Sequence, residues 1–245
     1  MDNKYKPFVY YYCKLSEDEQ LVYRQLLEGL KSHTEKCTVD KLCTTKQIKK
    51  ILTCIWLENP LISYYDTYTM YKVGELVTSV EFNYYLSKEA QEEINGAMRK
   101  QALTVAAYAR SKGPDIRNQV KAVHEYIVQW EYDHDFRSSS YSPAGALLYG
   151  RTVCKGVALT FKLVLDYLDI PSICVRGKHD GEGHAWNMAF YNNKYHFFDI
   201  TFDMSATKNR KISYKNFERS KHPEKYEPWE EFELPYCAAM KGEQK

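Results

Sequence analysis

Residues 150–169 read GRTVCKGVALTFKLVLDYLD, and this stretch decides the fold. Its apolar residues recur at three- and four-residue steps, the spacing of one helix face: Val153, Val157, Phe161, Val164 and Leu168. We therefore predict a helix over 151–169 that is buried along this stripe and ends before Pro171. Cys154 lies in its first turn, where the helix dipole and unpaired backbone amides favour the thiolate form.

The residues after this helix predict three strands. Short apolar and alternating runs indicate strands over 172–176, 184–191 and 194–201, with a flexible loop over 178–183. Asn192 and Asn193 tolerate positive φ and can form a tight turn between the last two strands. With this two-residue turn, His184 faces Thr201 and Asp199 faces Trp186 across the hairpin.

The predicted hairpin places a histidine and a carboxylate on one face. Because alternate residues share a face, His184 and Asp199 are diagonal neighbours, roughly 7–8 Å apart along the backbone and within side-chain reach. The rest of this face is apolar, so we expect it to pack on the Cys154 helix; it carries Trp186, Met188, Phe190, Tyr195 and Phe197. A turn one residue longer would send His184 and Asp199 to opposite faces.

These residue types suit nucleophilic catalysis. A cysteine nucleophile needs a thiolate, an imidazole that exchanges protons with it, and a third group that holds the imidazole tautomer. Cys154, His184 and Asp199 supply one group each, and Lys155 adds a positive charge beside the thiol.

Three blocks of sequence carry a family resemblance. Residues 150–158 (GRTVCKGVA), 184–187 (HAWN) and 199–203 (DITFD) occur in this order with compact spacing. In them the chain resembles the transglutaminase-like domain of bacterial proteins, strongly over about 116–203 and only vaguely elsewhere. The resemblance implies that Cys154 is the nucleophile, His184 the general base and acid, and Asp199 the residue that orients the histidine.

The resemblance also implies a fold and a reaction. The fold is α+β, with a papain-like core in which the cysteine-bearing helix packs on an antiparallel sheet. The reaction is acyl transfer from a peptide or glutamine amide to water or an amine, without a metal or organic cofactor. Protease, transamidase and amidase, including a peptide-deglycosylating amidase, share this acyl-enzyme step, so the substrate class stays open.

The chain also departs from the family pattern. Lys155 stands where glutamine or a related residue is common, Val157 where an aromatic is common, and Phe202 where tryptophan is frequent. These changes flank the three candidate catalytic residues. They leave the oxyanion donor open beyond the Cys154 backbone amide, and Tyr149 is our candidate for that role.

Each candidate also has a plainer interpretation. A cysteine in an amphipathic helix is most often a small buried hydrophobe, and only the three ordered blocks outweigh this for Cys154. Trp186 is a candidate substrate-binding residue, although core packing is the commoner role for such a side chain. The alternative to an enzyme is a catalytically silent peptide- or protein-binding module that retains the fold.

The flanking segments predict two further regions. We expect an N-terminal helical region over 1–97 with a tyrosine-rich connector that forms short strands, a core over 98–203, and an irregular extension over 204–245. A capping box at Ser16 and Glu19 starts the first helix, and Trp229 and Phe232 can dock the extension on the core.

Composition excludes several classes of partner. The chain has 245 residues, 44% hydrophobic content and a formal net charge of +2, without the basic stripe that binds phosphates, so we expect no nucleic-acid partner. The peptide or protein substrate is what the family resemblance implies. No apolar run has the length of a signal peptide or a membrane span, which predicts a cytoplasmic protein without a membrane partner. Seven scattered cysteines favour thiols over disulfides, and His33, Cys37 and Cys43 lack zinc-site spacing, so we expect no metal site. Oligomeric state leaves no signal in the sequence.

Overall fold

A computed structural model describes residues 5–207, 211–219, 223–229, 232 and 234–235. The chain divides into two compact units, one formed by Val9–Asn95 and the other by Met1–Phe8 together with Gly96–Lys245. The residues of the predicted C-terminal extension therefore belong to the same unit as the core. Among the described residues, no helix combines the length and apolar composition that crossing a bilayer requires.

The N-terminal unit is a mixed helix and sheet structure, so the expectation of a helical region is wrong in one respect. A short 3-10 turn precedes two helices and three antiparallel strands in the order β1-β3-β2; the elements are η1 (Tyr12–Lys14), α1 (Glu17–Ser32), β1 (Lys36–Thr44), α2 (Thr45–Glu58), β2 (Tyr65–Val73) and β3 (Leu76–Tyr84). The sequence predicts the strands of the tyrosine-rich segment but misses β1. The reason is that β1 is an edge strand whose register shifts between Thr38 and Cys43, which breaks the alternation of buried and exposed residues.

Local capping signals in this unit behave as predicted. Ser16 caps α1, and its hydroxyl accepts a hydrogen bond from the Glu19 amide while the Glu19 carboxylate accepts one from the Ser16 amide. Thr44 and Gln47 form the same box at the start of α2. The second box places the start of α2 at Thr45.

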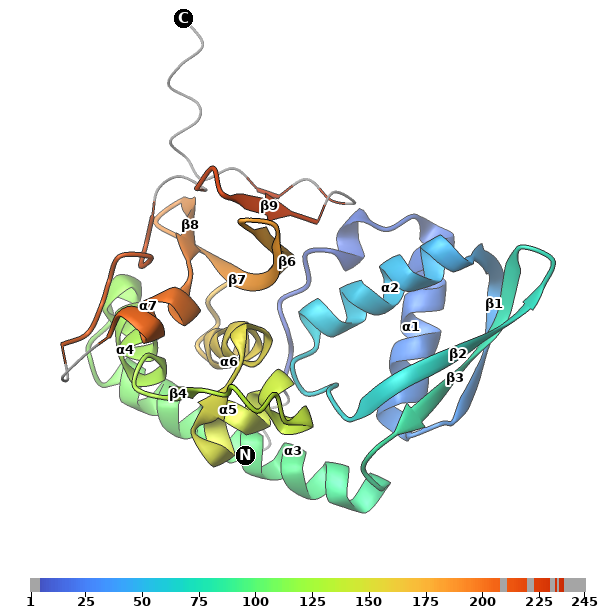
Figure 1. The fold of residues 1–245 in the computed structure, drawn as a ribbon, viewed down its shortest axis with the longest axis horizontal. Coiled ribbons are helices and arrows are strands. Elements are labelled where there is room, and N and C mark those ends of the chain that lie inside the picture. Colours follow the sequence, from blue (N-terminus) through green and yellow to red (C-terminus); the bar gives the residue numbers. More distant parts are fainter. Residues whose placement is uncertain (1–4, 208–210, 220–222, 230–231, 233, 236–245) are drawn as a thin grey trace, which may run out of the picture. The chain divides into compact units, whose positions relative to one another are not determined.

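The second unit holds the cysteine helix and a four-stranded antiparallel sheet in the order β8-β7-β6-β9 (Figure 1). Its helical elements are α3 (Lys88–Arg110), which begins in the N-terminal unit, α4 (Ile116–Ile127), η2 (Ser138–Tyr141), α5 (Pro143–Tyr149), α6 (Cys154–Tyr167) and α7 (Ile200–Ala206). Its strands are β4 (Glu131–Tyr132), β5 (Arg151–Thr152), β6 (Ser172–His179), β7 (Glu182–Tyr191), β8 (Lys194–Phe198) and β9 (Tyr226–Pro228). The fold class is thus α+β, and the four-stranded sheet is antiparallel, as predicted.

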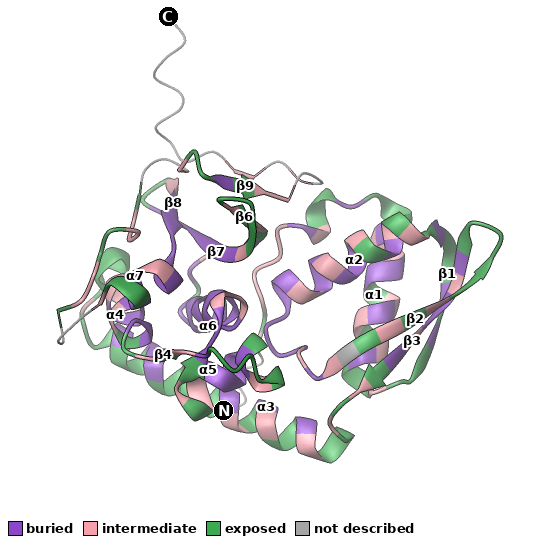
Figure 2. Cartoon of the chain, viewed as in Figure 1, coloured by how far each residue is buried: buried purple, intermediate pink, exposed green. Residues whose placement is uncertain are grey.

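Helix α6 is the centre of this unit. Every residue from Gly156 to Tyr167 is buried, and Figure 2 shows the helix almost entirely in the buried colour. The helix even buries an ion pair, Lys162 with Asp166 at 3.0 Å, whose side chains are 1% and 0% exposed. The N-terminal segment completes this pair, because Tyr5 donates to Asp166 at 2.8 Å and Lys162 donates to the Phe8 carbonyl at 2.8 Å. Satisfied partners of this kind are what makes a buried charge tolerable.

The β7–β8 hairpin has the predicted register. Asn192 and Asn193 adopt φ of 50° and 60°, and Tyr191 pairs with Lys194 as expected for a two-residue turn. The third strand is shorter than predicted, however, because it ends at Phe198. Asp199 caps α7 instead of continuing the strand, so Thr201 lies in a helix and does not face His184.

The predicted loop over 178–183 is wrong as well. Strands β6 and β7 continue through it as a second hairpin, in which His179 pairs with Glu182. Asp180 and Gly181 form its turn with φ of 49° and 84°. Asp180 and Gly181 are a residue pair that such turns prefer, but Gly183 and the polar residues around them also suit a longer loop, which is why one was expected.

The sheet packs on α6 through the face opposite to the predicted one. The Asn187 amide donates to the Ala158 carbonyl of α6 at 2.9 Å, and the Phe198 ring lies 5.3 Å from Phe161 between centroids. The face that carries His184 and Trp186 therefore faces away from the body of the helix. Both faces of β7 are buried along most of its length, so hydrophobic alternation does not distinguish them.

Gly156 generates a testable prediction about this packing. A Cβ at Gly156 would lie 2.9 Å from the Ser142 carbonyl oxygen and closer still to Thr152 Oγ1 and the Ser140 oxygen. We expect Gly156→Ala to lower the free energy of unfolding by ~1–3 kcal/mol, as overpacking does. Denaturant unfolding of the purified variants measures this.

A second helical glycine provides the control. A Cβ at Gly96 in α3 meets nothing within 4 Å. Gly96→Ala should therefore raise stability by ~0.5–1 kcal/mol through helix propensity alone. Similar changes in the two variants would contradict the close approach of η2 to the start of α6.

Candidate active site

Cys154 is the first residue of α6. Strand β5 leads into it and pairs in parallel with β4, and the Val153 amide donates to the Ser140 carbonyl at 3.1 Å. The N-cap residue Val153 offers no side-chain acceptor to the first amides of the helix. A partly exposed sulfur therefore lies at a helix N-terminus without a side-chain cap.

The other described cysteines have different surroundings. Cys37, Cys43, Cys54 and Cys174 are buried, and burial raises the pKa of Cys174 to about 12. Cys13 is exposed. Cys237 lies outside the described residues. Cys154 alone among the described cysteines combines partial exposure with the start of a helix.

His184 lies between the cysteine and a carboxylate. It is the third residue of β7, and its Nε2 is 2.6 Å from Asp199 Oδ2. The ring also hydrogen-bonds the Cys154 thiol. Because Asp199 occupies Nε2, Nδ1 is the nitrogen left for the sulfur. Burial lowers the pKa of His184, but the hydrogen bonds from Asp199 and Cys154 outweigh it and raise the pKa to about 9. The imidazole is therefore positively charged at neutral pH.

The direction of α6 explains why the thiol and the ring meet. Asn187 on β7 contacts Ala158 on α6. His184 precedes Asn187 by three residues and Cys154 precedes Ala158 by four, so helix and strand run in the same sense and the two side chains come together at their N-terminal ends. Contact thus occurs at the end of the helix and not through its packed face.

Asp199 is held by three donors. It is 1% exposed and caps α7 through Oδ1, which accepts the Phe202 amide at 3.1 Å. Oδ2 accepts both His184 Nε2 at 2.6 Å and the Tyr226 hydroxyl at 2.7 Å. A carboxylate with this many donors has one rotamer available and fixes the ring of His184 in turn.

Tyr226 was missed by sequence reasoning. It lies on β9, in the segment expected to be an irregular extension, and that segment docks through strand pairing with β6. Trp229 also contributes, since its amide donates to the Arg176 carbonyl at 2.8 Å. Phe232 packs beside Trp229, with ring centroids 5.6 Å apart. No motif in the sequence marks Tyr226, because its partner is 27 residues away.

The candidate substrate residues differ in exposure. Trp186 is 1% exposed and stacks beside His184 at 6.1 Å between ring centroids, so it supports the imidazole and presents no surface to a substrate. Tyr149 is the last residue of α5 and 60% exposed. Its role stays a prediction.

Two further side chains surround the thiol. The Tyr132 hydroxyl oxygen accepts a hydrogen bond from the backbone amide of Cys154, and burial raises the pKa of this phenol. The β4–β5 pairing positions Tyr132, which pairs with Thr152. Burial also lowers the pKa of Lys155 to about 8. The positive charge expected beside the thiol is therefore incomplete above neutral pH.

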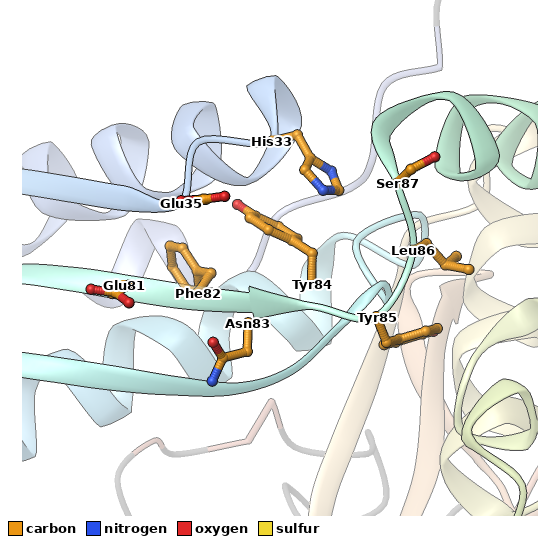
Figure 3. Close-up of a pocket in the computed structure, with 9 residues that line it drawn as sticks. All are labelled: His33, Glu35, Glu81, Phe82, Asn83, Tyr84, Tyr85, Leu86 and Ser87. Atoms are coloured by element: carbon orange, nitrogen blue, oxygen red, sulfur yellow. The ribbon is translucent and has the colours of Figure 1, made fainter.

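One pocket belongs to the N-terminal unit. It occupies about 500 Å³ in the N-terminal unit, where the His33 ring stacks on Tyr84 at 3.7 Å between centroids (Figure 3). Glu35 and Glu81 are among its lining residues. In the part of the chain that the structure describes, no group of three or more His, Cys, Asp or Glu side chains is placed to hold a metal ion.

Comparison with known proteins gives a family match over part of the chain. Residues 101–200 match the model of the Transglutaminase-like superfamily, and this range includes Cys154, His184 and Asp199. The chain contains a transglutaminase-like domain. Tyr226 lies beyond the matched residues. A search of curated proteins found no match.

Two solved structures resemble the chain distantly. A structure described as that of a TGase shares 15% identity, with a TM-score of 0.42 over 74% of this chain and 54% of that one. A candidate cysteine protease from Cytophaga hutchinsonii shares 13% identity, with a TM-score of 0.36 over 69% of this chain and 67% of that one. This chain thus spans about half the length of the first, and likenesses at these scores do not decide its activity.

The His184 pKa generates a prediction about the transglutaminase-like domain. Asp199→Asn removes the negative charge that holds the imidazolium, while the burial that opposes it remains. The pKa of His184 should therefore fall from about 9 by about 1–3 units. NMR titration of the imidazole ring measures it. An unchanged titration would show that Asp199 does not control the charge of the ring.

Proposed function

We propose that this chain is a transglutaminase-like cysteine enzyme that cleaves or transfers an amide acyl group through a thioester on Cys154. The observation that supports the proposal is the hydrogen-bonded series from the Cys154 thiol through His184 to Asp199. Its 2.6 Å contact holds the imidazole by one nitrogen and leaves the other for the sulfur. This is the arrangement that cysteine nucleophiles use on several unrelated folds.

The geometry supports a two-step reaction. In the first step the Cys154 thiolate attacks the amide carbonyl, and the imidazolium of His184 gives its proton to the departing amine, so that a thioester forms and the C–N bond breaks. In the second step His184 accepts a proton from water or an amine that attacks the thioester, and the thiolate is released. Asp199 holds the ring throughout.

The start of α6 can stabilise the charge that develops on the carbonyl oxygen. The Cys154 amide points from the N-terminus of the helix, where the dipole favours an anion. The Tyr132 hydroxyl lies at this amide and is a second candidate donor. Tyr149, the donor suggested by the sequence, is the more exposed of the two tyrosines.

A peptide or protein amide is the substrate class that we propose. The nucleophile is only partly exposed and the histidine side chain is 8% exposed, so a flexible chain can reach the sulfur more readily than a folded surface. Hydrolysis and transamidation share the thioester and differ in the acceptor that attacks it. The acceptor is therefore the property that separates the possible activities.

The first test compares two thiols in one chain. Cys13 is exposed and Cys154 only partly so, so accessibility alone would favour Cys13. We expect iodoacetamide to modify Cys154 at least about tenfold faster at pH 7, because an adjacent imidazolium stabilises the thiolate. The advantage should shrink as the pH rises through 9, where the imidazolium loses its charge and ordinary thiols ionise. Mass spectrometry of peptides after timed labelling gives both rates.

Two variants sharpen this comparison. His184→Ala should abolish the advantage of Cys154, whereas His196→Ala, which removes a histidine that stacks on Tyr191, should preserve it. Equal labelling of Cys13 and Cys154 in the unmodified chain would contradict the enzyme. It would favour the alternative, a peptide- or protein-binding module that keeps the fold.

The second test identifies the acyl group. Incubation with a mixed peptide library, rapid acid quench and mass spectrometry should show an adduct on the peptide that contains Cys154. A glutamine side-chain acyl group would indicate transamidation or deamidation, and a C-terminal acyl group would indicate proteolysis. Cys154→Ala is the control and should show no adduct. A labelled but never acylated Cys154 would restrict the chain to reactive binding without turnover.

A further inference from the structure

We propose that Tyr226 is a positioning residue of this site: its hydroxyl shares one oxygen of Asp199 with His184 and so limits the negative charge that the imidazole meets. The effect of Tyr226 on the rate of acyl transfer rests on the proposed function, whereas its effect on the pKa of His184 does not. The cysteine, histidine and aspartate all lie within the matched residues 101–200, and Tyr226 lies outside them.

The two donors meet on the same atom. Asp199 Oδ2 accepts His184 Nε2 at 2.6 Å and the Tyr226 hydroxyl at 2.7 Å, while Oδ1 is occupied by the Phe202 amide. A hydroxyl that donates to a carboxylate withdraws charge from the oxygen that it contacts. Each donor therefore weakens the hold of that oxygen on the other.

Tyr226 is rigid and remains a donor over the working pH range. It is 7% exposed, and its ring packs at 5.1 Å from Trp186 and 5.0 Å from Phe197 between centroids. Burial, followed by the charge of Asp199, raises the pKa of this phenol far above its ordinary value. The hydroxyl therefore keeps its proton while His184 titrates.

The backbone is built to bring Tyr226 to this place. In β6, Gly177 pairs with His184 on one side and with Pro228 of β9 on the other. A Cβ at Gly177 would lie 2.9 Å from Pro228 Cα and closer still to the Glu227 oxygen. Only glycine lets β9 pair directly behind the histidine. Outside the strand, the Lys225 ammonium and the Asp180 carboxylate form an ion pair at 3.0 Å.

Other titratable groups also face the His184 ring and contribute to its pKa. Cys154 reaches His184 from α6, Asp199 from the start of α7, and Tyr226 from β9. His179 on β6 lies 6.0 Å from it between centroids and packs on Tyr226. Tyr226→Phe removes one donor and leaves all these groups and the aromatic packing in place.

The sign of the effect follows from the shared oxygen. Without the hydroxyl, Asp199 Oδ2 directs its charge to His184 alone and stabilises the imidazolium more strongly. Tyr226→Phe should therefore raise the pKa of His184 by about 0.5–1 unit, a shift expected for the loss of one charge-assisted hydrogen bond. A stronger donor should act oppositely, so site-specific 3-fluorotyrosine at position 226 should lower the pKa of His184.

The experiment is an NMR titration of His184 in the full-length chain. Tyr191→Phe is the matched control, because Tyr191 is also buried and its hydroxyl donates to a carboxylate, Glu218, at 3.0 Å. It should leave the pKa of His184 unchanged. The proposal is overturned by a shift of the same size in both variants, by no shift in Tyr226→Phe, or by shifts of the same sign with phenylalanine and fluorotyrosine.

A second measurement separates this proposal from the proposed function. The titration is repeated in Cys154→Ala, where no thiol can react and the Tyr226→Phe shift should persist. When Cys154 is retained, Tyr226→Phe should move the alkaline limit of the acyl-transfer rate to higher pH. A shifted ring without any acylation of Cys154 would support the role of Tyr226 and contradict the enzyme. Acylation whose pH profile ignores Tyr226 would do the reverse.

Discussion

The buried carboxylate of Asp199 is the constraint on which the rest of the site depends. A carboxylate that is 1% exposed is stable only if its oxygens are satisfied, and here a backbone amide, an imidazole and a phenol satisfy them. Each donor comes from a different element, α7, β7 and β9. One desolvated charge therefore fixes the start of a helix, the ring of the histidine and the position of a strand from the end of the chain. The positive charge of His184 follows from this arrangement, and this charge lies beside the Cys154 thiol.

Helix α6 carries the Cys154 thiol, and the burial of this helix fixes the position of the sulfur. A helix surrounded on all sides has little freedom to shift, so the sulfur at its first residue stays where the N-terminus points. The ion pair of Lys162 with Asp166 costs desolvation, and Tyr5 and Phe8 offset that cost by hydrogen-bonding both partners. The first residues of the chain therefore act on the same helix as the cysteine, although they lie far from it in sequence.

The sequence predicts the elements whose signals are local. The stripe of α6, the Asn192–Asn193 turn with its register, and the capping box of α1 all depend on neighbours within a few residues, and all agree with the structure. The three ordered blocks were enough to bring Cys154, His184 and Asp199 together.

What the sequence did not predict depends on distant partners or on competing local signals. Asp199 ends β8 because its carboxylate caps α7 instead of continuing the strand. The face of β7 that packs on α6 could not be chosen because both faces are buried along most of the strand. Tyr226 follows from a pairing between β6 and β9 that no periodicity encodes.

A second histidine–aspartate pair shows what the first one needs in order to be a site. His124 Nε2 is 3.0 Å from Asp203 Oδ2, with both side chains 0% exposed, and Asp203 lies one turn after Asp199 on the same helix. Asp203 also accepts the Ser213 hydroxyl at 2.9 Å. Among the described residues, however, His124 Nδ1 has no hydrogen-bond partner, and no thiol takes the place that Cys154 takes beside His184. The two pairs are alike in geometry and differ in what the far nitrogen meets. His124 with Asp203 anchors α7 to α4, and that anchor holds the helix whose first carboxylate orients His184. A hydrogen-bonded histidine and aspartate can therefore be purely structural, and what distinguishes the His184 pair is the thiol at the N-terminus of α6 beside its other nitrogen.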